Sequence, residues 1–166
     1  MVEKKFVVDG LKLSYNGTFD IIDFFKNVEN WISENNKEKD IKKKLEHVEP
    51  KGKKVEWFLE IWEDINEWTR SIVRIQAHFT DVTELTVKKG NRKKRLNKGN
   101  VLITFDGILE TDIEGKWQQK PWFYFLRAVS DRFLWKFHMN KMEDKLAADT
   151  YSLNNRLKEF FGKYKV

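Results

Sequence analysis

Apolar and polar residues alternate along much of the chain, and this period of two predicts β-strands. Residues 5–15 end with an apolar residue at every second position, which predicts the first strand. The most regular alternation lies in 101–109, where Val, Ile, Phe, Gly and Leu share one side of the predicted pleat. Gly107 stands inside this strand, and a glycine there indicates a bulge or the close approach of another backbone, with the last helix as the candidate.

The middle of the chain predicts further strands joined by short turns. Residues 55–61 are apolar at every second position, and 71–87 continue the pattern with a change of phase. The phase change predicts a β-bulge near 80–81, because a straight strand of that length, at about 3.3 Å per residue, is too long for the domain. Residues 45–48 predict a short strand, and the polar stretch 35–44 predicts a linker running into an edge strand.

Two segments have apolar residues at the helical spacing of three and four positions. The first predicts a helix over 19–34, with Thr18 as its N-cap. The second predicts a long helical region over 121–161, which begins at a proline and ends before a glycine. A polar interruption at 138–140 predicts a kink or a short break in this region.

This order of elements predicts an α+β fold. We expect a curved antiparallel β-sheet of about five to six strands that grips a long C-terminal helix, with one helix between the first and second strands. The chain has 166 residues, close to the size of one domain, so residues 1–166 are expected to form a single domain.

Composition narrows the classes of function. The chain has no cysteine, which excludes disulfides and thiolate metal sites. No run resembles a secretory signal or approaches the roughly 20 apolar residues that span a bilayer, so we expect a cytoplasmic protein without a transmembrane segment. His47, His78 and His138 lie on different predicted elements without the spacing of metal ligands. We therefore expect no metal and no cofactor, and the absence of a catalytic motif disfavours an enzyme without excluding one.

Acidic residues gather on the polar sides of two predicted strands. Glu56 and Glu60 share one strand, and three acids lie between 106 and 112. Two carboxylates on neighbouring strands can perform general acid–base catalysis. Their alternation with apolar residues favours a solvated sheet face instead, in which Arg70 and Arg74 pair across the strands with some of the acids.

The net charge of +6 comes from one segment. Residues 88–98 hold seven basic residues and no acidic one, so the rest of the chain, with 25 basic and 26 acidic residues, is close to neutral. A basic hairpin can bind the phosphates of nucleic acid or of an anionic membrane surface, and a solvated lysine-rich loop is the alternative. The candidate anion-binding residues are Lys88, Lys89, Arg92, Lys93, Lys94, Arg95 and Lys98.

Aromatic residues are more numerous than one helical stripe needs, with 13 Phe and 7 Trp. They can form a broad core, line a pocket for an apolar small molecule or lipid, or cover the interface of a homodimer. The candidate ligand-binding residues lie on the predicted sheet and on the first part of the last helical region. They are Trp57, Phe79, Phe105, Trp122, Phe125, Leu126, Val129 and Phe133.

The order of a first strand (5–15), a helix (19–34), antiparallel strands between 45 and 112, and a long helix (121–161) resembles the helix-grip fold of the START and Bet v 1-like families. The resemblance covers most of the chain and is one of element order, without a shared motif. Those families usually have two short helices where this chain predicts one, and they have more strands. In them the sheet and the last helix enclose an apolar cavity.

Two hypotheses of function follow. The resemblance implies a non-enzymatic binding protein for a hydrophobic or amphipathic, lipid-like ligand held between the sheet and the last helix. It also leaves room for an enzyme of the polyketide-cyclase kind, although no residue is assigned to that role. The alternative comes from the charge pattern and is a nucleic-acid-binding module that uses residues 88–98 as a phosphate clamp.

Overall fold

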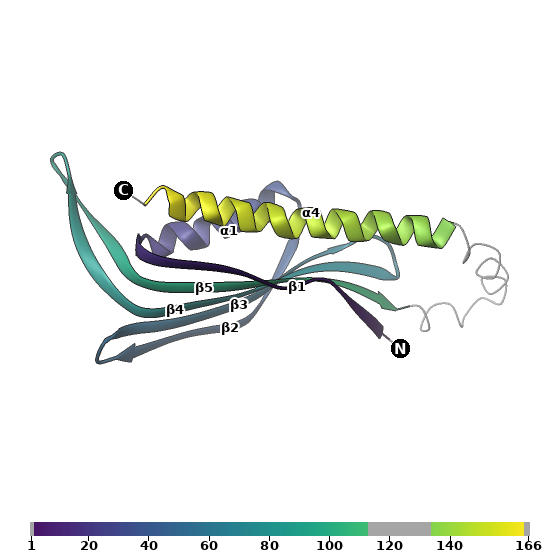
Figure 1. Cartoon of the computed structure of the whole chain (residues 1–166), viewed down its shortest axis with the longest axis horizontal. Coiled ribbons are helices and arrows are strands. Elements are labelled where there is room, and N and C mark those ends of the chain that lie inside the picture. The colour runs from purple at the N-terminus through teal and green to yellow at the C-terminus, as the bar shows by residue number, and fades with distance from the viewer. Residues whose placement is uncertain (1, 113–133, 165–166) are drawn as a thin grey trace.

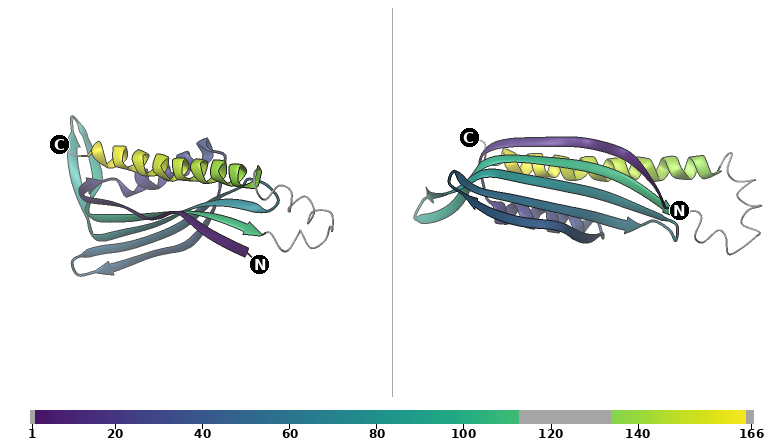
Figure 2. Two further views of the ribbon diagram at one scale, coloured as in Figure 1. Left: turned by 45° about the vertical axis from the view of Figure 1, so that its right-hand side comes forward. Right: turned by 90° about the horizontal axis from the view of Figure 1, so that it is seen from below.

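The protein is a sheet with helices on one face. The computed structural model describes residues 2–112 and 134–164. In that part of the chain, five antiparallel strands form one sheet in the order β1-β5-β4-β3-β2, and two helices pack on the same face (Figures 1 and 2). The elements are β1 (Val2–Phe19), α1 (Ile21–Glu34), β2 (Glu38–Glu49), β3 (Gly52–Asp64), β4 (Thr69–Lys89), β5 (Arg92–Asp112) and α4 (Leu134–Gly162).

The predicted α+β class is confirmed. Strands β2 to β5 follow one another as antiparallel neighbours, as short turns require. Strand β1 lies at the far edge beside β5, and α1 crosses the sheet from that edge to β2 at the opposite edge. The helix between the first two strands and the helix at the C-terminal end are both where the pattern predicts them.

Strand β2 corrects the predicted linker. Its pairing with β3 begins at Glu38, opposite Trp62, so only the start of the polar stretch 35–44 is a connection. Every residue of β2 is exposed, and β2 is an edge strand of the sheet. Charged residues are the common protection of such an edge against pairing with other chains. The polar composition of 35–44 suggested a linker, but it belongs mostly to an edge strand whose charges protect it against pairing with other chains.

Strand β4 bends where the phase of its pattern changes. Its pairing with β5 shifts between Thr80 and Thr83, and Asp81 has a φ of 54°, so the predicted bulge is confirmed. A straight strand of the 21 residues of β4 would extend about 70 Å. The bulge instead turns the end of the β4–β5 hairpin toward the helical face of the sheet (Figure 1).

Helix α1 begins two residues later than predicted. Asp20 is its N-cap, and the Asp20 carboxylate accepts hydrogen bonds from the backbone N–H groups of Ile22 (3.0 Å) and Asp23 (3.3 Å). Thr18, the predicted cap, is still in β1 and pairs with Lys98 of β5. Both residue types can cap a helix, and the pairing of β1 with β5 decides which one does.

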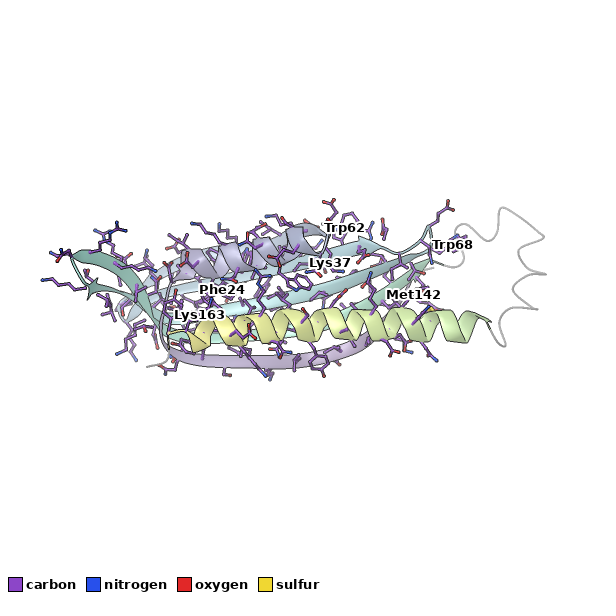
Figure 3. The ribbon with its side chains drawn as sticks, turned by 90° about the horizontal axis from the view of Figure 1, so that it is seen from above. Phe24, Lys37, Trp62, Trp68, Met142 and Lys163 are labelled. Carbon is purple, nitrogen blue, oxygen red and sulfur yellow. The ribbon has the colours of Figure 1, made fainter. Side chains whose placement is uncertain are left out.

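The core between the sheet and the helices is aromatic. Phe24 of α1 has no exposed surface, and its ring centroid lies 5.2 Å from that of Phe79 in β4 and 5.9 Å from that of Phe161 in α4. Figure 3 places Phe24 between α1 and the C-terminal part of α4. The cluster joins three elements that are distant in sequence, and aromatic pairs at these distances add to the stabilisation from burial.

Helix α4 runs without interruption from Leu134 to Gly162. The predicted kink at 138–140 is therefore wrong, because the polar residues there continue the helix. Residues 121–133 of the predicted helical region lie outside the described residues. No described helix is long and apolar enough to cross a bilayer.

Gly107 lets α4 approach β5 closely, as the sequence suggested for the last helix, although the atoms nearest to it are side-chain atoms and not backbone atoms. A Cβ at this position would lie 2.9 Å from Thr150 Oγ1 and 3.4 Å from both the Leu146 Cγ and the Val8 Cβ. The Thr150 hydroxyl cannot swing away without cost, because it donates a hydrogen bond to the Leu146 carbonyl (2.8 Å) and is fully buried. The contact fixes the distance between helix and sheet.

We expect Gly107→Ala to destabilise the protein by about 1–3 kcal/mol, the usual cost of inserting a methyl group into a packed core. Urea denaturation measures this. The matched control is Gly162→Ala, because a Cβ there meets no atom within 4 Å. Equal losses of stability in the two variants would show that the packing of α4 on β5 does not require a glycine at position 107.

Candidate functional site

The seven basic residues of 88–98 lie on both strands of the β4–β5 hairpin, on either side of a turn at Gly90 and Asn91. Gly90 has a φ of 62°, the left-handed conformation that favours glycine at a tight turn. Lys88 pairs with Lys93 across the strands, and Lys89 pairs with Arg92. Like charges directly opposite each other destabilise a hairpin, so a bound anion would stabilise this one.

These cations face solvent and are almost free of acidic partners. All of them except Lys89, whose side chain is not described, are exposed. Within the described part of the chain, Lys94 has one ion pair, with its Nζ 3.9 Å from an Asp23 oxygen. Lys88, Arg92, Lys93, Arg95 and Lys98 form no ion pair or side-chain hydrogen bond there. The hairpin therefore presents unneutralised positive charge beyond the end of the core (Figure 1).

A groove of about 290 Å³ lies at the base of this hairpin, and we call it the hairpin-base groove. It forms where the bend of β4 brings the hairpin to the start of α1, and the Asn97 Oδ1 accepts a hydrogen bond from the Ile21 N–H (3.1 Å) at that junction. Five elements contribute to it. Its lining residues are Asp20, Ile21, Ile22, Glu46, Lys53, Val55, Val82, Glu84, Arg95, Leu96 and Asn97.

Arg95 is the one lining residue of this groove that the sequence predicted as a site residue. The other lining residues gave no signal in the sequence, because they come from the start of α1 and from one or two positions on each of four strands. A bulge and a helix N-cap bring them together, and neither is a motif. The shift of phase near 80–81 was the available clue, since it predicted a β-bulge, and a bulge bends its strand.

The predicted apolar ligand site is only partly described. Trp57, Phe79 and Phe105 all lie in the core beneath the helices, with at most 3% of their surface exposed. Trp57 and Phe79 pack against rings of α1, with centroids 4.8 Å apart for Phe25 and Trp57. The other five predicted residues, Trp122, Phe125, Leu126, Val129 and Phe133, lie outside the described residues. The cavity and the homodimer both stay predictions.

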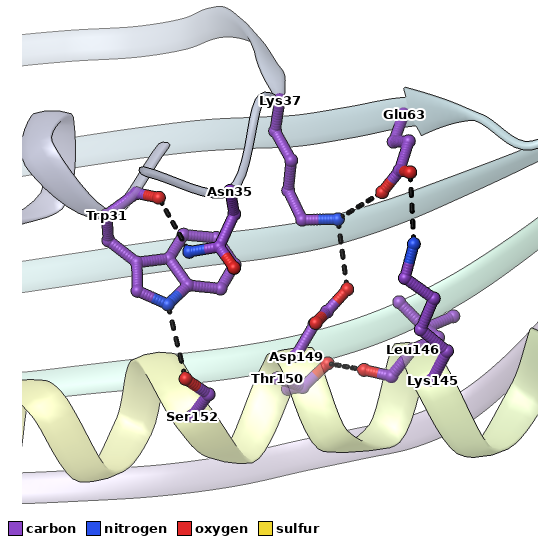
Figure 4. Close-up of polar contacts among 9 residues, drawn as sticks. All are labelled: Trp31, Asn35, Lys37, Glu63, Lys145, Leu146, Asp149, Thr150 and Ser152. Carbon is purple, nitrogen blue, oxygen red and sulfur yellow. Dashed lines mark hydrogen bonds and ion pairs between the residues drawn. The ribbon is translucent and has the colours of Figure 1, made fainter. Parts of the chain in front are cut away.

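An ion-pair network centred on the buried Lys37 attaches α4 to the sheet (Figure 4). The Lys37 side chain is only 2% exposed, and its Nζ lies 2.6 Å from Glu63 Oε2 and 3.0 Å from Asp149 Oδ2. Lys145 of α4 donates to the other Glu63 oxygen at 3.1 Å. The network is structural, because Lys37 is enclosed and both carboxylates are paired. The sequence did not indicate it, since Lys37 lies in the polar stretch read as a linker.

This network predicts a pH dependence of stability. Burial of the Glu63 carboxyl raises its pKa, but hydrogen bonds and charge from Lys37 and Lys145 lower it by more, so the pKa lies below the ordinary value of 4.5. A group with a depressed pKa in the folded state stabilises the fold above its unfolded-state pKa and loses that effect as the pH falls through the folded-state value.

We expect the wild type to be more stable than Glu63→Gln near neutral pH, and the difference between them to shrink below about pH 4.5. Urea denaturation over this pH range measures the difference. Glu49→Gln is the control, because Glu49 is exposed on β2. A difference that stays constant with pH would contradict the assignment of the network.

Some of the ion pairs expected between arginines and acids on the solvated face of the sheet are present. Arg74 donates to Glu60 at 3.5 Å, as predicted, while Arg70 pairs across the strands with Asp64 at 2.7 Å, an acid outside the set that the sequence singled out. A hydrogen bond from Lys43 holds the pKa of Glu56 below its ordinary range, which makes Glu56 unsuited to act as a general acid.

The described histidines and acids form no metal site. Among the described residues, no group of three or more His, Asp or Glu side chains converges on a point that could hold a metal ion. His47 is exposed on β2, and His78 lies beside the Phe58 ring with its Nδ1 4.0 Å from Glu56. The side chain of His138 lies outside the described residues.

Comparison of the chain with protein-family models, with curated proteins and with solved structures found no match.

Proposed function

We propose that this protein is a non-enzymatic nucleic-acid-binding module and that the β4–β5 hairpin is its phosphate clamp. The single observation that carries the proposal is the row of exposed, unpaired cations on a ribbon that projects from the core. Five of the seven have no ion pair among the described residues, so their charge is available to a ligand. The rest of the chain is close to neutral, which concentrates the positive field at this end.

The shape of the hairpin favours a duplex over a single strand. A two-stranded β-ribbon has the width of the major groove of B-DNA, and its flanking cations then face phosphates on both sides. Single-strand binding relies on aromatic side chains that stack on bases. Residues 88–98 contain no aromatic residue. The strands on either side of the tip are paired throughout, so the ribbon is preformed.

The affinity of the protein for duplex DNA of about two helical turns, measured at several salt concentrations, tests the proposal. We expect the logarithm of the binding constant to fall linearly with the logarithm of the salt concentration, with a slope of about −3.6 to −6.3 for roughly four to seven contacted phosphates. A vesicle containing anionic lipid is the parallel probe. No binding to the duplex, or tighter binding to the vesicle than to the duplex at the same salt, would overturn the proposal.

The helix-grip resemblance supplies a second candidate. We propose that the fold is of the helix-grip kind, and the support is the order of elements together with a helix that covers one face of a curved antiparallel sheet. An apolar or lipid-like ligand between α4 and the sheet would then be the expected cargo. Native mass spectrometry of the protein purified from cells tests this, and apo protein that also takes up no apolar dye would contradict it.

A further inference from the structure

The hairpin-base groove has an apolar floor of fixed shape. Val55, Val82 and Leu96 line it, and each is less than a tenth exposed. Ile21 and Ile22 add apolar surface from the start of α1, and Ile22 is 62% exposed at the open side of the groove. A flat ligand with apolar faces would cover this surface and remove it from water.

The polar groups of the groove are of both signs. Lys53 and Glu46 pair with each other (3.0 Å) and Asp20 caps α1, while Arg95, Glu84 and Asn97 remain available to a ligand. Arg95 and Glu84 line it, and neither forms an ion pair or a side-chain hydrogen bond with the described residues. The Asn97 Oδ1 already accepts the Ile21 N–H, which leaves the Asn97 amide group as a donor. Beside the paired Lys53 and Glu46 and the capping Asp20, the groove therefore offers one cation (Arg95), one carboxylate acceptor (Glu84) and one amide donor (Asn97) next to an apolar surface.

This combination matches a nucleotide. A nucleobase has apolar faces and an edge with both donors and acceptors, and carboxylates accept hydrogen bonds from the amino group of cytosine. The adjoining phosphate would lie on Arg95, which belongs to both the groove and the basic hairpin. The volume of about 290 Å³ is at the lower end of small-ligand sites, which suits a single nucleotide.

We propose that the hairpin-base groove holds one unpaired nucleobase of the nucleic acid bound by the hairpin. This inference rests on the proposed function and narrows it to duplexes that contain a bulged or mismatched nucleotide. Extruding such a base costs less free energy than opening a complete base pair. The protein should therefore bind these sites more tightly than a complete duplex.

Two duplexes of the same sequence, one with a single bulged cytidine, test the proposal. We expect the wild type to bind the bulged duplex about tenfold more tightly, a difference of about 1.4 kcal/mol in binding free energy. Ile22→Trp should fill the open side of the groove and abolish this preference, while the affinity for the complete duplex and its salt slope stay unchanged. Ile41→Trp, at an exposed position of β2, is the control and should keep the preference.

A second readout examines the groove directly. Titration with cytidine monophosphate should shift the methyl NMR signals of Val82 and Leu96, and Ile22→Trp should remove these shifts. Salt-sensitive binding of both duplexes with equal affinity would overturn the base-binding inference and leave the proposed function standing. Absence of binding to either duplex would overturn both. Methyl shifts caused by a fatty-acid anion but not by the nucleotide would also overturn the inference and assign the groove to a lipid.

Discussion

Replacing all four residues of the Arg-Lys-Lys-Arg run at 92–95 with serine is expected to weaken duplex binding by about a hundredfold or more at physiological salt. Each cation at a phosphate releases counterions from the duplex, and the substitutions remove most of the tip of the clamp. The fold should survive, because these side chains are exposed and lie in a hairpin end whose like charges repel one another. Equilibrium binding and urea denaturation of the same protein measure both effects.

The matched control removes four lysines from β2, at positions 39 and 42–44. It lowers the formal net charge of +6 by the same amount, at a different place on the molecule. Lys42 and Lys43 are paired with acids of β3, so they contribute little free charge. We expect this variant to lose far less affinity than the hairpin variant. Equal losses would mean that net charge decides the binding and that the hairpin is not a clamp.

Phe24→Ala is expected to destabilise the fold by about 3–5 kcal/mol, the usual cost of removing a buried phenylalanine. Phe24 contacts the rings of Trp57, Phe79 and Phe161, so its removal opens a cavity where the sheet and both described helices meet. A domain of this size has a total stability of about 5–15 kcal/mol, so the loss is a large share.

The urea midpoint of the variant measures this loss, and Ile22→Ala on the exposed side of α1 is the control. We expect the control to change stability by less than about 0.5 kcal/mol, as for most surface substitutions. A small effect of Phe24→Ala would mean that the aromatic cluster relaxes around the gap and does not hold the helices on the sheet.

The alternation of residues was enough to predict the strands that are covered on one face. In β3, and in β5 from Val101 to Phe105, the buried positions repeat every second residue, so the sequence carries the signal directly. Gly107 was informative for the same reason, because a residue without a side chain in a regular apolar row needs a neighbour that fills its place. Thr150 of α4 is that neighbour.

The start of the edge strand and the groove could not be predicted in this way: the pattern predicted a strand over 45–48, whereas β2 begins at Glu38. An edge strand such as β2 has no buried face, so nothing in its composition distinguishes it from a polar linker. The burial of Lys37 depends on its ion pair with Asp149, which lies more than a hundred residues later in the chain. No local pattern of residues can indicate a contact between positions so far apart in the sequence. The hairpin-base groove combines residues of five elements, and it exists because the bulge at Asp81 turns the hairpin toward α1.

The most direct test of the phosphate clamp is the position of the bound duplex on the protein, measured by backbone amide NMR shifts during a duplex titration. We expect the largest shifts in residues 83–98 and at the start of α1, and little change along β2 or in the second half of α4. Large shifts in β2 or α4 with an unchanged hairpin would contradict the account.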